Sequence, residues 1–303
     1  MKTNSLNLTT QNIPTLVKQL TIPASTGMFF NTMYNVVDTF YAGLISTQAI
    51  SALTLSFMIF FLIIGFGYGF SSAITALLGN ALGKRKYKLA SIYAHKGLIF
   101  VPIIGLILSI LGYYFSPSLF ILLGAKEEYL QISIDYINPI LFGTLFFMFN
   151  FSLNSILVAT GDTKTYRNSL IFGFFANLAL NPLFMYGFLF IPAMGIKGIA
   201  IATVLIQIIN MCYLFYKVLQ TKLIHFEKPE YFLPNIRVYK QFLIQGIPSS
   251  LNMLTMAIGS LILTYFVSHY GVNAVAGFGC KNRSNLDTSF RNTWTPKSLL
   301  FGH

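Results

Sequence analysis

Seven apolar stretches, each long enough to cross a lipid bilayer, constrain this chain more than any other feature of its sequence. A helix needs roughly 20 apolar residues to span the hydrocarbon core. The stretches also lack the period-two alternation of an outer-membrane strand. We place the spans at 15–43, 50–82, 93–115, 130–159, 169–190, 198–216 and 242–267. The sequence therefore predicts an all-α integral membrane protein.

The charged residues fit this class and indicate an orientation. They make up 9% of the chain, against about a quarter in a soluble domain. The basic residues gather in alternate loops, at 84–88, 164–167 and 217–240, so the net charge of +12 is no signal for nucleic acid. The positive-inside rule predicts a multi-pass protein of the cell membrane with a cytoplasmic N-terminus. Two cysteines, Cys212 and Cys280, give no disulfide framework or metal-binding pattern.

One acid interrupts the first span. Asn31, Asn35 and Asp38 are spaced four and three residues apart, which places them on one face of a helix. A carboxylate that faces lipid costs on the order of 3 kcal/mol. We therefore expect Asp38 to face a protein interior or a hydrated cavity. The alternative is a position near the helix end, where the carboxylate reaches headgroup water.

Two further spans carry asparagine pairs at helical spacing. Asn150 and Asn154 lie in the fourth span, and Asn177 and Asn181 lie in the fifth. Such amides can pair across helices without any ligand. Three polar stripes and one buried acid together favour a hydrated cavity among the first six spans. In such a cavity, Asp38 can exchange a proton or coordinate Na⁺.

The first span recurs near the end of the chain. Residues 21–54 align without a gap on residues 246–279, so that Pro23 falls on Pro248 and Met28 falls on Met253. Six spans separate the start of one copy from the start of the other, so both copies enter the membrane from the same side. This is a parallel repeat of two six-helix halves, typical of secondary transporters. Asp38 falls on Leu263, so the acid belongs to the first half alone.

The repeat also suggests how the chain is divided. We expect a six-helix N-terminal lobe at 1–216, a cytoplasmic linker at 217–240 and the start of a second lobe, with one helix, at 241–279. The remaining residues, 280–303, are polar and unlike the rest. We expect a fragment of a longer transporter, with a frameshift or false end near Cys280.

Several longer motifs resemble one transporter family. They are VDTFYAG in the first span, GFGYGFSSAITALLGNALGKRKYKLA in the second span and its loop, LVATGDTKTY after the fourth, and ANLALNPLFMYG with GIKGIAIATVLIQ further on. Over about residues 15–279 the chain resembles the MATE (multidrug and toxin extrusion) antiporters. The resemblance implies a monomeric twelve-helix transporter of two lobes, which exports drugs in exchange for H⁺ or Na⁺.

The resemblance also implies roles for individual residues. Pro23 matches a proline that bends the first helix. Asn181 stands where one branch has an aspartate, and Met256 where another has a glutamate. The family's cation site maps onto Asp38, with Asn177, Asn181, Tyr136 and Thr203 around it. We expect a substrate cavity lined by Asn31, Asn35, Asn150 and Asn154.

The predicted function is therefore export of small organic, mainly cationic, compounds across a lipid bilayer. It needs no cofactor and no metal besides a coupling Na⁺ or H⁺ at Asp38. A flippase for lipid-linked oligosaccharides or polysaccharides, of related architecture, is one alternative; the spans hold almost no Lys or Arg to bind its phosphates. A non-functional fragment is another. We expect no enzyme, because we find no cluster of His, Asp or Glu at a membrane face.

Overall fold

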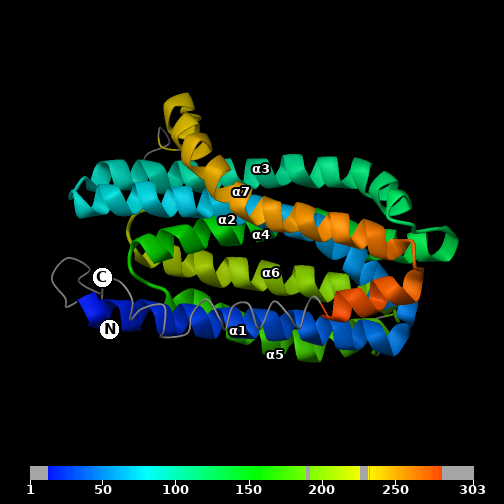
Figure 1. Cartoon of the computed structure of the whole chain (residues 1–303). Helices are drawn as coiled ribbons and strands as arrows, with labels where there is room; N and C mark the ends of the chain where they lie inside the picture. Colours follow the sequence, from blue (N-terminus) through cyan, green and yellow to red (C-terminus); the bar gives the residue numbers. More distant parts are fainter. Residues whose placement is uncertain (1–12, 189–191, 226–230, 232, 282–303) are drawn as a thin grey trace.

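The structure, a computed structural model, describes residues 13–188, 192–225, 231 and 233–281. Successive long helices run in opposite directions through the bundle, which confirms the predicted all-α fold (Figure 1). A further helical segment, which the sequence analysis did not assign, covers 272–281. Within the described ranges the long helices are α1 (Ile13–Ile45), α2 (Thr47–Gly83), α3 (Tyr87–Leu122), α4 (Glu127–Ala159), α5 (Lys164–Tyr186), α6 (Gly195–Gln220) and α7 (Ile236–Ser268).

Six of the described helices, α2 to α7, are long and apolar enough to cross a membrane. Helix α1 has 33 residues, which is ample length, but it does not reach the same hydropathy. Its asparagines, threonines and single acid lower the average. Among the described long helices, the one that carries Asp38 is therefore the one without a membrane-length stretch as apolar as those of the other six.

Most helix ends lie a few residues from the predicted ones, and three of the differences have a local cause. The prediction that the third span ends at residue 115 is wrong, because α3 continues through Pro117 to Leu122 and buries Phe120 completely. Proline removes one backbone donor, but an apolar environment favours keeping all other helical hydrogen bonds. Helix α5 ends at Tyr186, before Gly187 with its φ of 77°. Helix α7 begins early because the Asn235 side chain accepts hydrogen bonds from two backbone N–H groups of its first turn.

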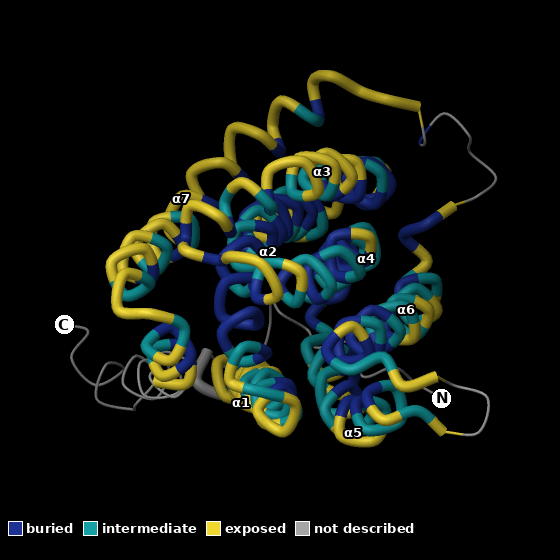
Figure 2. The backbone as a smooth tube through the Cα atoms, turned by 90° about the vertical axis from the view of Figure 1, so that its right-hand side faces the viewer, coloured by how far each residue is buried: buried dark blue, intermediate teal, exposed yellow. Residues whose placement is uncertain are grey.

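Small residues allow α2 to lie at the centre of the bundle. Figure 2 shows α2 and α4 as the most buried helices, whereas α7 exposes its outer side. A Cβ atom at Gly69 would lie 2.7 Å from the carbonyl oxygen of Gly246 in α7. A Cβ atom at Gly67 would meet the ring of Phe151 in α4. These glycines let two helices approach the α2 backbone from opposite sides.

Helix α3 holds the connection between α6 and α7. His95 and Lys96 are both buried in the structure, with 0% and 3% of their surface exposed. The backbone N–H of His225 donates to Nε2 of His95 over 3.1 Å, and the Lys96 ammonium donates to the carbonyl oxygen of Leu233. Of the linker predicted at 217–240, residues 226–230 and 232 lie outside the described residues, as do residues 282–303 of the predicted tail.

Candidate functional site

The acid of α1 lies between two helices. The Asp38 side chain is 4% exposed. Its Oδ1 accepts hydrogen bonds from the Nδ2 atoms of Asn177 and Asn181, each over 2.8 Å. Both asparagines belong to α5 and are fully buried. The carboxylate thus points into the bundle and not toward solvent beyond a helix end.

The spacing of the two asparagines explains this geometry. Asn177 and Asn181 are four residues apart, so that both amides lie on the side of α5 that faces α1. Nδ2 of Asn181 also donates to Oδ1 of Asn177 over 3.2 Å. Oδ1 of Asn181 is buried and has no hydrogen-bond partner within the described residues. An unsatisfied acceptor beside a carboxylate is an arrangement that suits a cation.

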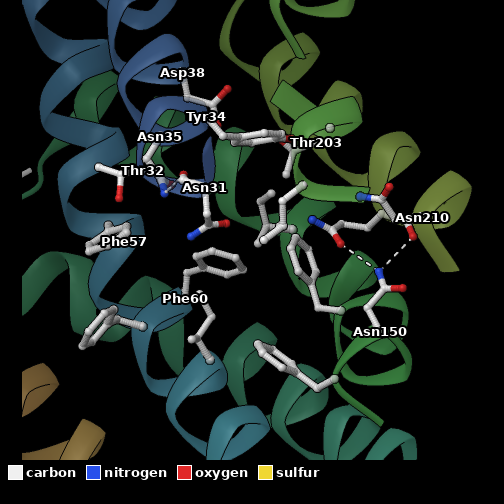
Figure 3. A pocket seen from close by; sticks show the side chains of 18 of the residues that line it. Asn31, Thr32, Tyr34, Asn35, Asp38, Phe57, Phe60, Asn150, Thr203 and Asn210 are labelled. Atoms are coloured by element: carbon white, nitrogen blue, oxygen red, sulfur yellow. Dashed lines mark hydrogen bonds between the residues drawn. The ribbon is translucent and has the colours of Figure 1, made fainter. Parts of the chain in front are cut away.

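A cavity of about 220 Å³ opens beside the acid (Figure 3). Helices α1, α2, α4, α5, α6 and α7 all contribute to its wall. Much of the lining is aromatic, with the rings of Phe60 and Phe147 at 5.0 Å between centroids and those of Phe57 and Phe61 at 5.5 Å. Among the residues described as lining the cavity, Asp38 carries the one formal charge. The cavity is therefore an apolar space with a negative charge at one side.

Most of the residues proposed from the sequence meet at this cavity. Asn177 and Asn181 contact Asp38 from α5 but do not line the cavity themselves. Asn154 does not line it either, and its Oδ1 is buried without a partner in the described part of the chain. Pro23 lies inside α1, away from the lining. The predicted residues that do line the cavity are Asn31, Asn35, Asp38, Tyr136, Asn150 and Thr203.

Several polar lining residues were missed, among them Tyr34, Gln207 and Asn210. The hydroxyl of Tyr34 donates to Oγ1 of Thr203 over 3.0 Å and so links α1 to α6 across the cavity. Gln207 and Asn210 lie on α6, three residues apart. That spacing was a usable signal, because it repeats on α6 the pattern that singled out the asparagines of α1, α4 and α5.

The arrangement supports cation chemistry. A buried carboxylate among amides binds H⁺ directly, or binds Na⁺ with further oxygen ligands. The amide oxygen beside the acid that has no hydrogen-bond partner in the described residues is Oδ1 of Asn181, which could serve as a further sodium ligand if the amide turns. An organic cation in the adjoining cavity would be attracted by the same charge.

Comparisons with known proteins agree with this architecture. The sequence model of the MatE family matches residues 23–183, just over half of the chain. The chain is 30% identical over 247 residues to the "Probable multidrug resistance protein YoeA" of Bacillus subtilis. That match covers 79% of this chain and 52% of the relative. This chain is also 26% identical over 265 residues to an "FAD transporter" of Shewanella oneidensis. That match covers 87% of this chain and 58% of the relative.

Solved structures give the same result at the level of the fold. An outward-facing multidrug resistance MATE family transporter of the MOP superfamily superposes with a TM-score of 0.77 at 28% identity. A MOP superfamily transporter of Pyrococcus furiosus gives a TM-score of 0.77 at 29% identity. Each superposition covers 89% of this chain and 60% of the other, so the chain spans little more than half the length of its relatives. From the sequence match and the shared bundle together, this chain belongs to the MatE family.

Proposed function

We propose that this chain supplies the cation and substrate sites of a secondary antiporter in the cell membrane. The antiporter would export small organic cations, including drugs, in exchange for H⁺ or Na⁺, with Asp38 as the cation site. The observation that carries the proposal is the Asp38 carboxylate, 4% exposed, held by two amides and adjoining an aromatic cavity. Intramembrane acids in such positions are typical of ion pathways.

The geometry suggests how cation binding would change the cavity. Asp38 lies on α1, and the amides that it contacts lie on α5. A cation at the carboxylate competes with these amide donors, so its binding changes the preferred contact between the two helices. Asn31 and Asn35 lie on the same helix as Asp38 and line the cavity. Occupancy of the acid therefore biases the shape of the substrate site, as alternating access requires.

Several features favour organic cations as substrates. The lining combines aromatic faces, which attract cations, with a single acid. The residues described as lining the cavity include no Lys or Arg, which argues against the alternative of a flippase for phosphate-linked lipids. Relatives named as multidrug resistance or export proteins, from Bacillus subtilis and Staphylococcus aureus, support the same substrate class. We further propose a cytoplasmic N-terminus, because the basic loops lie at the end of the bundle where α1 begins.

Ethidium efflux tests the proposal. Cells that produce the chain are loaded with ethidium, and its loss is followed by fluorescence while proton and sodium gradients are varied separately. Wild type should lose ethidium in a manner that depends on one of the two gradients. Replacement Asp38→Asn should abolish the dependence while the protein still inserts in the membrane. Efflux by D38N with unchanged gradient dependence would reject the cation-site assignment, and no efflux by wild type would favour a chain that does not transport by itself.

A further inference from the structure

The cavity has a second polar wall, opposite the acid. Asn150 of α4 and the two amides of α6, Gln207 and Asn210, form this group, which we call the amide wall. In Figure 3, Asn150 and Asn210 lie on one side of the cavity and Asn31, Asn35 and Asp38 lie on the other. The two sides therefore differ in charge: one carries an acid and the other carries neutral amides.

Hydrogen bonds fix which end of Gln207 is available to the cavity. Nδ2 of Asn150 donates to the backbone carbonyl oxygen of Gln207 over 3.0 Å. A backbone carbonyl can only accept, so this contact establishes the Asn150 amide as the donor. The same Nδ2 donates to Oε1 of Gln207 over 2.8 Å. The oxygen of Gln207 is thus engaged by Asn150, and its Nε2, with two N–H donors, is the end left for a ligand.

Asn210 adds a second amide with unused capacity. Its side chain is 6% exposed and lines the cavity, and it makes no side-chain hydrogen bond to the residues that the structure describes. On the same wall, Oδ1 of Asn150 is buried and has no partner in the described ranges. Buried amides in native proteins normally form hydrogen bonds, so donors and acceptors without partners on this wall indicate that it binds a ligand.

We infer that the amide wall recognises a hydrogen-bond acceptor on the substrate, through the Nε2 donors of Gln207 and the amide of Asn210. This rests on the proposed transport function and narrows its substrate class. The substrates are compact planar ring systems with an amine that faces the acid side and a carbonyl-type oxygen at the opposite edge. Asn150 acts as a positioning residue, because it holds the Gln207 side chain with its donor toward the cavity.

The size of the cavity supports a compact ligand. Pockets for drug-sized molecules commonly enclose roughly 300–1,000 Å³. The cavity here, at about 220 Å³, is smaller and suits two or three fused rings. The rings of Phe60 and Phe147, which both line it, offer surfaces on which such a ring system can pack.

The test compares two probes with the same ring skeleton and the same ammonium group, of which one carries carbonyl acceptors on its central ring. They are 2-(aminomethyl)anthracene and 2-(aminomethyl)anthraquinone, which share one ammonium group and three fused rings, while the quinone adds two carbonyl oxygens. Their dissociation constants are measured by calorimetry on the purified chain in lipid nanodiscs. The wild-type protein should bind the quinone about fivefold more tightly or better, the equivalent of one hydrogen bond.

Replacement Gln207→Glu is the informative variant, because it retains an oxygen for Asn150 and removes the donor that faces the cavity. Its added charge attracts both ammonium groups alike, so the ratio of the two constants isolates the acceptor. The preference for the quinone should fall at least about fivefold in Q207E, and also in Gln207→Leu. Met253→Leu, an apolar change of similar volume in the lining, should leave the ratio unchanged.

The outcomes separate this inference from the transport function. If the ratio of the two dissociation constants is the same in wild type and Q207E, the role of the amide wall is refuted and the proposed antiport is unaffected. No binding of either probe to wild type would also overturn the inference, while the ethidium assay decides on transport independently. A lower ratio in Q207E with a wild-type ratio in M253L would support the inference.

Discussion

The replacement Asp38→Asn separates the role of the carboxylate from its place in the fold. Asparagine has nearly the same shape and keeps an oxygen for the two amide donors of α5. Each hydrogen bond to a charged acceptor is about 1 kcal/mol stronger than its neutral equivalent, so the change loses about 2 kcal/mol. Relief from burying a charge contributes several kcal/mol in the opposite direction. We therefore expect D38N to fold with a stability close to that of wild type or above it.

The effect on cation binding should be far larger. A monovalent ion about 4 Å from the carboxylate gains about 4 kcal/mol at an effective dielectric constant of about 20. Loss of that attraction lowers the affinity by roughly three orders of magnitude. In wild type, sodium at 100 times its dissociation constant would stabilise the folded chain by about 2.7 kcal/mol. D38N should lose this stabilisation.

Thermal unfolding of the purified chain measures both quantities. Sodium chloride is exchanged for potassium chloride at constant ionic strength and pH, and a second series varies pH at constant sodium. Wild type should respond to one of the two cations, and D38N should respond to neither while it unfolds cooperatively. A D38N protein that retains the full wild-type response would refute the reasoning, because the cation would then bind elsewhere.

Three further replacements test other parts of the structure. Gly69→Leu should destabilise the chain by about 1–3 kcal/mol in thermal unfolding, because a Cβ atom at this position meets the backbone of α7. The control Gly79→Leu should not destabilise it, because no atom lies within 4 Å of a Cβ atom there. Lys96→Met should raise the rate of backbone amide hydrogen exchange at residues 221–225 and 233–235, because it removes the contact from α3 to the carbonyl oxygen of Leu233. The control Lys88→Met, at an exposed position, should leave these rates unchanged. Asn181→Leu removes one amide donor from the carboxylate and one nearby side-chain oxygen, so it should shift the midpoint of the cation-dependent stabilisation about tenfold: to higher sodium if Na⁺ is the coupling ion, and to lower proton concentration if it is H⁺. An unchanged midpoint would contradict a shared site.

The sequence predicted the long helices of this fold well, because a helix that crosses lipid needs a long run of apolar residues that is easily recognised. Such runs are plain in the sequences of α2 to α7. The prediction failed after residue 115, where Pro117 and the preceding Ser116 looked like a turn. In an apolar environment the backbone retains its helical hydrogen bonds past such residues.

The candidate site was less predictable, because its contacts join distant helices. Asn150 and Asn154 are four residues apart, but only Asn150 lines the cavity. The most apolar part of α4 is 72% buried, so a polar side chain on almost any face of it lies inside protein. The bond from Asn150 to Gln207 joins residues 57 positions apart, and no local pattern reveals it.

The low hydropathy of α1 bears on how the protein is made. During synthesis a segment partitions into the bilayer by itself only when its average apolar character is sufficient, and α1 falls below the level that α2 to α7 reach. Its acid gains its amide neighbours only after α5 has been synthesised, more than a hundred residues later. We therefore expect α1 to be retained at the insertion machinery until α5 arrives, so that biogenesis of this helix depends on its eventual partner.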